Sequence, residues 1–246
     1  PILLALFRFG QGLGLGGEWG GAVLLATENA PAGKKAWYGM FPQLGAPLGF
    51  LISSVTFFLL SKLLSDAQFL SFGWRIPFIA SALLVWVGLY VRLKIAETPD
   101  FMNVIENNAR VKLPVIDVFL KHTKAIMLGT VATITTFLLF YLMTVFTLSW
   151  GTSALHYSRT SFLIAQMISV VFFGLGIPIS AVLADKYGRS QMLLLATAGI
   201  FLFGLFFSPL FSTGSWTITV IFLVIGMFLM GLTYGPIGTA LAGIFP

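Results

Sequence analysis

Apolar stretches of membrane-spanning length recur along this chain, and short polar joints separate them. A helix needs about 20 apolar residues to cross the hydrocarbon core of a bilayer. Seven stretches approach or exceed this length, at residues 1–30, 38–61, 74–95, 125–150, 162–184, 192–211 and 216–245. Only 9% of the 246 residues are charged, whereas about 25% is usual in soluble domains. The sequence therefore predicts an all-α polytopic membrane protein with seven transmembrane helices.

The basic residues predict the orientation of these helices. If the first stretch runs from outside to inside, the joints at 31–37, 96–124 and 185–191 are cytoplasmic. Together with the helix-end residues Arg92 and Lys94, these joints hold ten of the fourteen basic residues. The outer side keeps Lys62, Arg75 and Arg159, and Arg8 lies within the first stretch. This imbalance follows the positive-inside rule and favours the stated orientation.

The longest joint predicts the domain organisation. Residues 97–123 collect charges and separate three helices before them from four after them. We expect residues 1–96 and 124–246 to form two helical groups that are joined only by this cytoplasmic loop. The chain begins without a methionine and stops directly after an apolar stretch, so we expect it to be a piece of a longer membrane protein.

A glycine-rich segment, RFGQGLGLGGEWGG at residues 8–21, lies in the first stretch. Three of its glycines match the G-x-G-x-x-G spacing of a dinucleotide-binding turn, but such a turn needs a preceding strand and a βαβ unit, which a 30-residue apolar block does not provide. Four of its glycines lie within about 60° of one another on a helix, in the small-xxx-small register that lets membrane helices pack closely. These predicted packing residues are Gly10, Gly14, Gly17 and Gly21.

Polar residues form a second stripe on the same helix, about 120° away. It contains Arg8, Gln11, Glu18 and Trp19. A charged side chain inside a membrane costs about 3 kcal/mol or more, so it usually faces a water-filled cavity, a substrate or an opposite charge. We predict that Glu18 and Arg8 couple proton movement to function, because desolvation can raise the pKa of an intramembrane carboxyl into the range of proton relay. The alternative is that Arg8 extends to the outer interface while Glu18 only braces the bundle.

Three other polar residues are candidates for lining a substrate cavity beside Gln11 and Trp19. Gln43 lies in FPQLGAP, between prolines that free backbone carbonyls, although a simple interhelical hydrogen bond explains it equally well. Tyr141 offers a hydroxyl, as do Thr133, Thr136 and Thr144 on the same stretch. Tyr234 matches Trp19 at an internal offset of 215 residues that also superimposes two glycine pairs. That offset is the one expected if the first and seventh helices occupy corresponding places in repeated halves.

Other chemical classes find no support in the residues. Cysteine is absent, and the two histidines both lie in polar joints, so no metal cluster, thiol nucleophile or catalytic triad is suggested. The net charge of +6 is scattered over loops, which argues against nucleic-acid binding. We expect no enzyme activity, no metal and no cofactor.

Several segments resemble the metabolite:proton symporter family of the major facilitator superfamily. RFGQGLGLGGEWGGAVLLATENAP and YGMFPQLGAPLGF are similar to its fourth and fifth helices, and GWRIPFIASALLVWVGLYVRLKIAETPDF to its sixth helix and central loop. ISAVLADKYGRSQ resembles the superfamily's loop signature between helices eight and nine, although Ala181 and Ser190 depart from the usual pattern. The resemblance covers essentially the whole chain, as helices four to ten of a twelve-helix, two-bundle fold.

This resemblance implies a function. It implies proton-coupled symport of a small organic acid or zwitterionic metabolite by alternating access, in a multi-pass protein of the bacterial inner membrane. The expected partners are the solute, protons and lipid, and the protein is expected to be a monomer. The resemblance also implies that the loop residues Asp185, Lys186, Gly188 and Arg189 gate the cytoplasmic side. The alternative from the helix count alone is a seven-helix receptor or photoprotein, but the seventh stretch lacks the buried lysine that a retinal protein needs.

Overall fold

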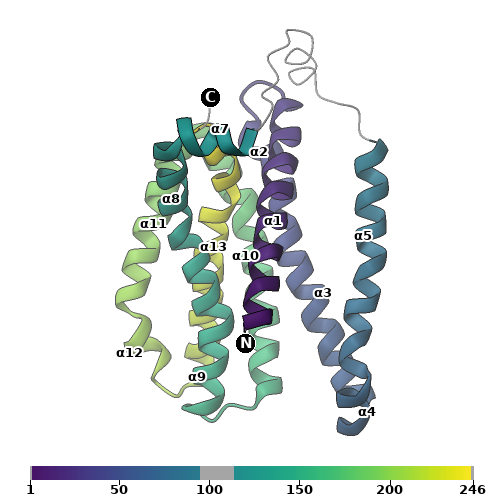
Figure 1. Cartoon of the computed structure of the whole chain (residues 1–246). Helices are drawn as coiled ribbons and strands as arrows, with labels where there is room; N and C mark the ends of the chain where they lie inside the picture. The colour runs from purple at the N-terminus through teal and green to yellow at the C-terminus, as the bar shows by residue number, and fades with distance from the viewer. Residues whose placement is uncertain (1, 95–113, 245–246) are drawn as a thin grey trace.

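The computed structural model of the chain describes residues 2–94 and 114–244, with the backbone alone for residues 114–117. In these residues every regular element is helical. The elements are α1 (Ile2–Glu28), α2 (Lys35–Gly39), α3 (Phe41–Leu63), α4 (Asp66–Ser71), the 3-10 helix η1 (Gly73–Arg75), α5 (Ile76–Lys94), α7 (Pro114–Lys121), α8 (Thr123–Tyr141), the π-helix η2 (Leu142–Phe146), α9 (Thr147–Ser153), α10 (Arg159–Tyr187), α11 (Arg189–Leu205), α12 (Phe207–Phe211) and α13 (Trp216–Ala242). The long helices run side by side in Figure 1, with α2 and α7 at one end and α4 at the other.

Each of the seven predicted stretches contains a long helix. Within the described residues, five spans are long and apolar enough to cross a membrane: Lys35–Leu63, Gly73–Lys94, Thr123–Ser153, Arg159–Tyr187 and Trp216–Ala242. Helix α1 has 27 residues, but its glycines and charged residues lower its mean hydropathy. Helix α11 is shorter, with 17 residues. The prediction of a multi-pass helical membrane protein is therefore confirmed.

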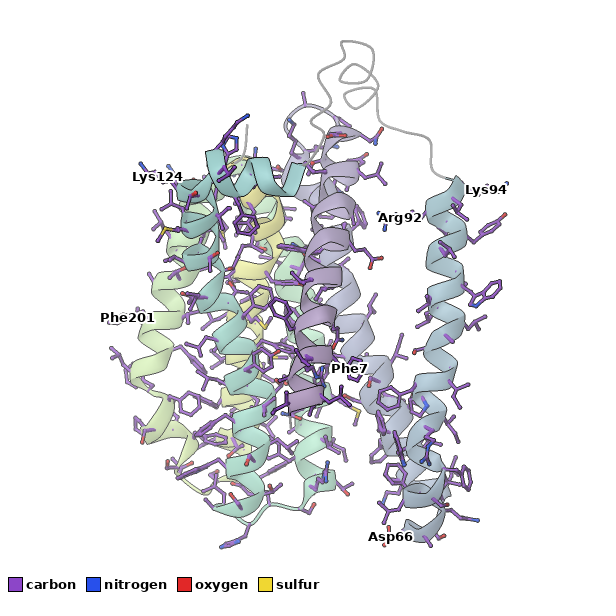
Figure 2. All side chains as sticks on the ribbon, viewed as in Figure 1. Phe7, Asp66, Arg92, Lys94, Lys124 and Phe201 are labelled. Carbon is purple, nitrogen blue, oxygen red and sulfur yellow. The ribbon has the colours of Figure 1, made fainter. Side chains whose placement is uncertain are left out.

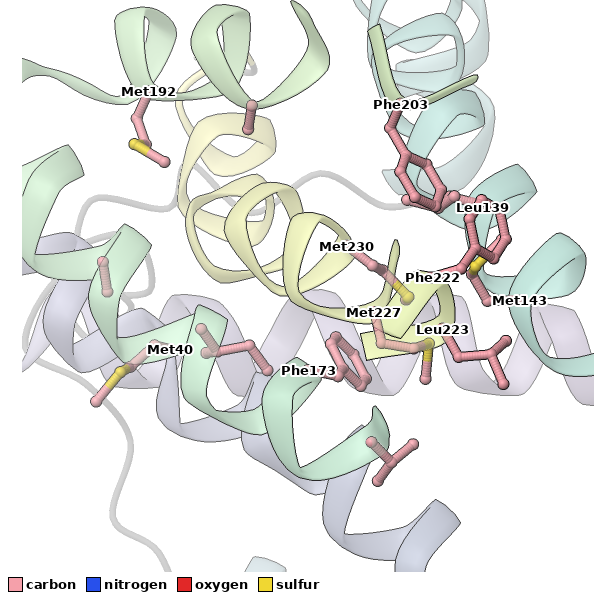
Figure 3. Packing of buried hydrophobic residues seen from close by; sticks show 14 of the residues in the cluster. Met40, Leu139, Met143, Phe173, Met192, Phe203, Phe222, Leu223, Met227 and Met230 are labelled. Carbon is pink, nitrogen blue, oxygen red and sulfur yellow. The ribbon is translucent and has the colours of Figure 1, made fainter. Parts of the chain in front are cut away.

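The centre of the packing lies between α10 and α13. A Cβ atom at Gly176 of α10 would lie 2.7 Å from the carbonyl oxygen of Phe228 and 3.0 Å from the Cα of Gly231, both on α13. One turn further on, Gly235 packs against Ser180, whose hydroxyl donates a hydrogen bond of 3.3 Å to the carbonyl of Gly231. Small residues thus let these two backbones touch. Figure 3 shows the apolar side chains around this contact, including Phe173, Met227 and Met230.

The glycines of α1 do not pack in this way. A Cβ atom at Gly10, Gly14, Gly17 or Gly21 would meet no heavy atom within 4 Å. Helix α1 contacts its neighbours through a different side and mainly near its C-terminal end, where Val23 and Thr27 are buried. The predicted close packing of this glycine stripe is therefore wrong for the helices that the structure describes, because the stripe faces away from all of them.

The helices before and after the predicted central loop contact one another directly. Helix α3 packs on α10, and α1 and α2 pack on α13. Small residues again allow the approach, since Gly39 of α2 meets Thr239 of α13 and Pro47 of α3 lies beside Gly174 of α10. The expectation that the two groups are joined only by the loop is therefore wrong. Within the predicted loop, residues 97–113 lie outside the described residues and 114–121 form α7, so the domain boundaries stay a prediction.

Helix α8 passes into a π-helical turn that the sequence analysis did not predict. Residues 142–146 form η2, and α9 continues the same span. A π-helical turn leaves backbone carbonyls without their usual partners. Gln166 of α10 meets this need, because its Nε2 donates to the carbonyls of Met143 at 3.2 Å and Thr144 at 2.6 Å. The buried glutamine therefore joins α10 to the irregular turn.

Candidate functional site

Two residues predicted to line the substrate cavity are in contact. The indole Nε1 of Trp19 on α1 donates a hydrogen bond of 2.6 Å to the side-chain oxygen of Gln43 on α3. Gln43 is completely buried. An indole N–H is a donor only, so it fixes which end of the amide is the oxygen. The amide nitrogen of Gln43 is consequently turned away from Trp19.

That amide nitrogen has no hydrogen-bond partner in the part of the chain that the structure describes. It lies against α13, since a Cβ atom at Gly238 would be 2.7 Å from Gln43 Nε2 and 2.9 Å from a methyl group of Val23. A pocket of about 290 Å³ opens between α1 and α13, and its lining includes Trp19, Val23 and Gly238. The hydrogen-bonded pair Trp19–Gln43 therefore lies where α1 and α3 meet α13.

The two tyrosines predicted for the cavity occupy different surroundings. Tyr234 on α13 is partly buried, and its ring contacts Phe137 at 6.3 Å and Phe173 at 5.5 Å between centroids. Tyr141 at the end of α8 is 61% exposed, and its ring packs on Phe140. The structure thus brings Tyr234 into the aromatic packing between α8, α10 and α13.

The charged residues of α1 are exposed. Arg8 donates a hydrogen bond of 3.1 Å to the side-chain oxygen of Gln11, one turn away on the same helix. Glu18 is exposed although its neighbour Trp19 is partly buried. The polar stripe is therefore divided: Trp19 turns toward α3, while Arg8, Gln11 and Glu18 remain on the open side of α1. Figure 2 shows Phe7 on this part of α1.

Asp185 makes the best-defined polar contact of the predicted loop. Its two carboxylate oxygens accept hydrogen bonds from the backbone N–H groups of Ala36 at 2.8 Å and Trp37 at 2.9 Å. Both donors lie in the first turn of α2, whose N–H groups have no partner within the helix. A carboxylate is favoured there because the helix dipole places partial positive charge at that end. Asp185 thus ties the end of α10 to the start of α2.

The other loop residues have distinct environments. Arg189, the first residue of α11, donates a hydrogen bond of 2.6 Å to the carbonyl of Thr239. This carbonyl belongs to the last turn of α13, where carbonyls lack helical partners and a cation is favoured. Gly188 joins α10 to α11 with φ of 99°, a conformation that favours glycine. Lys186 is exposed and lies over the ring of Tyr187 at 5.0 Å.

Several contact partners were missed by sequence reasoning. Ala36, Trp37 and Thr239 contribute backbone groups. Val23 contributes only the volume of its side chain, and Gly238 contributes only its lack of a side chain. No side-chain chemistry marks such positions in a sequence. In the described residues there is also no group of three or more His, Asp or Glu side chains that could hold a metal ion.

Comparison with known proteins gives the class of this arrangement. The model of the Major Facilitator Superfamily matches residues 1–246. The chain is 50% identical to the inner membrane metabolite transport protein YhjE of Escherichia coli over 100% of its length, 38% identical to the Escherichia coli shikimate transporter over 80%, and 32% identical to a putative proline/betaine transporter of Staphylococcus haemolyticus over 100%. No solved structure matches it significantly.

The chain therefore belongs to the Major Facilitator Superfamily, a family of membrane transport proteins. Within that superfamily it is similar to metabolite transport proteins. It spans 57%, 45% and 52% of the lengths of the three relatives above.

Proposed function

We propose that this chain is part of a proton-coupled symporter that moves a small carboxylate-bearing metabolite across the bacterial inner membrane by alternating access. The observation that carries this proposal is the pair of hydrogen bonds from Ala36 and Trp37 to Asp185. They connect the helices before residue 97 with those after residue 123. Alternating access needs such a contact between the halves, strong enough to close one side and weak enough to open.

The size of this contact suits a reversible gate. Hydrogen bonds to a charged group contribute about 1.5–3 kcal/mol each. Two such bonds hold a conformation in clear majority, yet a bound solute with a few kcal/mol of differential affinity reverses the preference. Asp185 is the gating residue in this proposal. Arg189 supports it by holding the end of α13 close to the same loop.

The closed side is the cytoplasmic one in this proposal. The contacts of α2 with α10 and α13 lie at the α2 end of the molecule. Arg92, Lys94 and Lys124 lie at the same end in Figure 2, and Asp66 lies at the other. The positive-inside rule assigns the end rich in lysine and arginine to the cytoplasm.

The solute class follows from the named relatives. Shikimate, proline and betaine differ in shape and in amine content, but each carries a carboxylate. We infer that the solute of this protein carries one too. Proton coupling is assigned to Glu18 with Arg8 assisting, because an intramembrane carboxylate is costly unless it has a functional reason to be there.

Transport assays on the full-length protein test this proposal. The protein is reconstituted into liposomes with an inward proton gradient, and the uptake of radiolabelled shikimate, proline and glycine betaine is followed. We expect at least one of them to accumulate above its external concentration, and a protonophore to abolish the accumulation. Uptake that only reaches equilibrium and ignores the protonophore would refute proton coupling. Uptake of none of the three would refute the proposed solute class.

A further inference from the structure

The side chain of Gln43 holds an unused hydrogen-bond donor at the boundary between the halves. It is completely buried, and its Nε2 is without a partner in the described residues. Buried amides in native proteins are nearly always paired, so an unpaired one needs a reason. Gln166, the other buried glutamine described here, illustrates the usual case, because its Nε2 donates to two carbonyls.

The orientation of the Gln43 amide is fixed by its neighbour. Trp19 Nε1 donates to Oε1 at 2.6 Å. Rotating the amide by half a turn would place two donors against each other, because an indole nitrogen accepts no hydrogen bond. The free N–H groups therefore point to the other side, toward Gly238 of α13 and Val23 of α1.

Gly238 covers the free donor. A Cβ atom at this position would lie 2.7 Å from Nε2 and 2.9 Å from a methyl group of Val23, so a side chain here would have to displace the amide or Val23 before α13 could lie this close. In the alternating access proposed above, helix α13 moves relative to α1 and α3. When it moves away, the amide nitrogen faces the space between the halves, beside the pocket that Trp19 and Gly238 line.

We propose that Gln43 Nε2 binds the carboxylate of the transported solute when α13 withdraws, and that Trp19 is the positioning residue that turns this donor toward the solute. This inference rests on the proposed function. An ionised carboxylate is a strong hydrogen-bond acceptor and has no donor of its own, so it suits an unpaired amide N–H group. The amide is neutral, so it binds a carboxylate without retaining it as firmly as a buried cation would.

The test measures binding to the full-length protein. Dissociation constants are determined for whichever of shikimate, proline and glycine betaine the protein transports. Inhibition constants are determined by competition for the analogue of that solute in which a primary alcohol replaces the carboxylate. The variants are Gln43→Leu, Gln43→Glu and Trp19→Phe, with Gln166→Leu as the matched control at a buried glutamine whose donor is already satisfied by two backbone carbonyls. Thermal unfolding of each purified variant establishes that it is folded.

We expect Gln43→Leu to weaken binding of the acid about 10- to 100-fold, the range of a hydrogen bond to a charged group. Gln43→Glu, which keeps the shape but sets a carboxylate against a carboxylate, should weaken it further. Trp19→Phe should cause a smaller loss, because the donor remains but is no longer oriented. Binding of the alcohol analogue should change less than about threefold, and Gln166→Leu should affect the acid and the alcohol equally.

Two results would overturn the inference while leaving the proposed function intact. One is an acid affinity within about threefold of wild type in Gln43→Leu. The other is an equal loss for the acid and the alcohol, which would make Gln43 a purely structural link between α1 and α3. If the wild-type protein transports no carboxylate solute at all, the proposed function fails and this inference fails with it.

Discussion

The carboxylate of Asp185 lies 2.9 Å from the backbone nitrogen of Trp37, which precedes it by 148 residues. The contact joins the last turn of α10 to the first turn of α2. It uses backbone donors, so its strength depends on the position of α2 and not on the identity of the side chains there.

Asp185→Asn should favour opening of the side that this contact closes. The amide retains one acceptor oxygen but loses the charge and the second acceptor, so we expect the ratio of closed to open molecules to fall about 5- to 30-fold. Residues 1–246 contain no cysteine, so once any cysteines elsewhere in the full-length protein are replaced, Lys34→Cys can report opening by its rate of thiol labelling. Asp66→Asn, at the other end of the molecule, is the control and should leave that rate unchanged.

Gly176→Ala should destabilise the contact between α10 and α13. The new methyl group would lie 2.7 Å from the carbonyl oxygen of Phe228, and overpacking of this kind costs about 1–3 kcal/mol. Gly204→Ala on α11 is the matched control, because a Cβ atom there meets no heavy atom within 4 Å. Thermal unfolding of the purified protein should show a lower midpoint for the first variant only. Equal midpoints would contradict the close approach of the two helices.

Gln166→Leu should weaken the junction between α10 and η2. The carbonyls of Met143 and Thr144 would lose the donor that now reaches both of them, and a buried unsatisfied acceptor costs about 1–3 kcal/mol. Gln191→Leu, at an exposed position of α11, serves as the control. Hydrogen exchange of the 142–153 segment should accelerate in the first variant alone. Unchanged exchange would mean that the π-helical turn holds its shape without Gln166.

Glu18→Gln should abolish proton-driven accumulation in the full-length protein while leaving some substrate binding. Glutamine keeps the shape and hydrogen-bonding capacity of the side chain but exchanges no proton. Uptake under a pH gradient and solute exchange at equal pH on both sides separate the two steps. Arg8→Ala should instead weaken the binding or coupling of an anionic solute. Near wild-type accumulation by Glu18→Gln would show that another residue carries the proton.

Local sequence patterns are sufficient to predict the helices and the family. Hydropathy over about 20 residues is a local property, so the positions of the membrane segments follow from composition alone, as does the side on which lysine and arginine gather. The loop signature around Asp185 is also local, and it singled out Asp185 and Arg189 without any information about their contacts. Gln43 and Trp19 were singled out for being polar in apolar surroundings, which requires no knowledge of their neighbours.

Which of these residues are in contact depends on the tertiary structure. Two glycine stripes in the same register differ in outcome, because α13 presents Gly231 and Gly235 to α10 while α1 turns Gly10 and Gly14 away from every described helix. The partners of Asp185 are backbone groups, which any sequence supplies. The rotation of each helix about its axis, and the neighbour that the rotation selects, depend on packing between segments 24 to 149 residues apart. That packing is a collective property of the bundle, so no local sequence pattern predicts it.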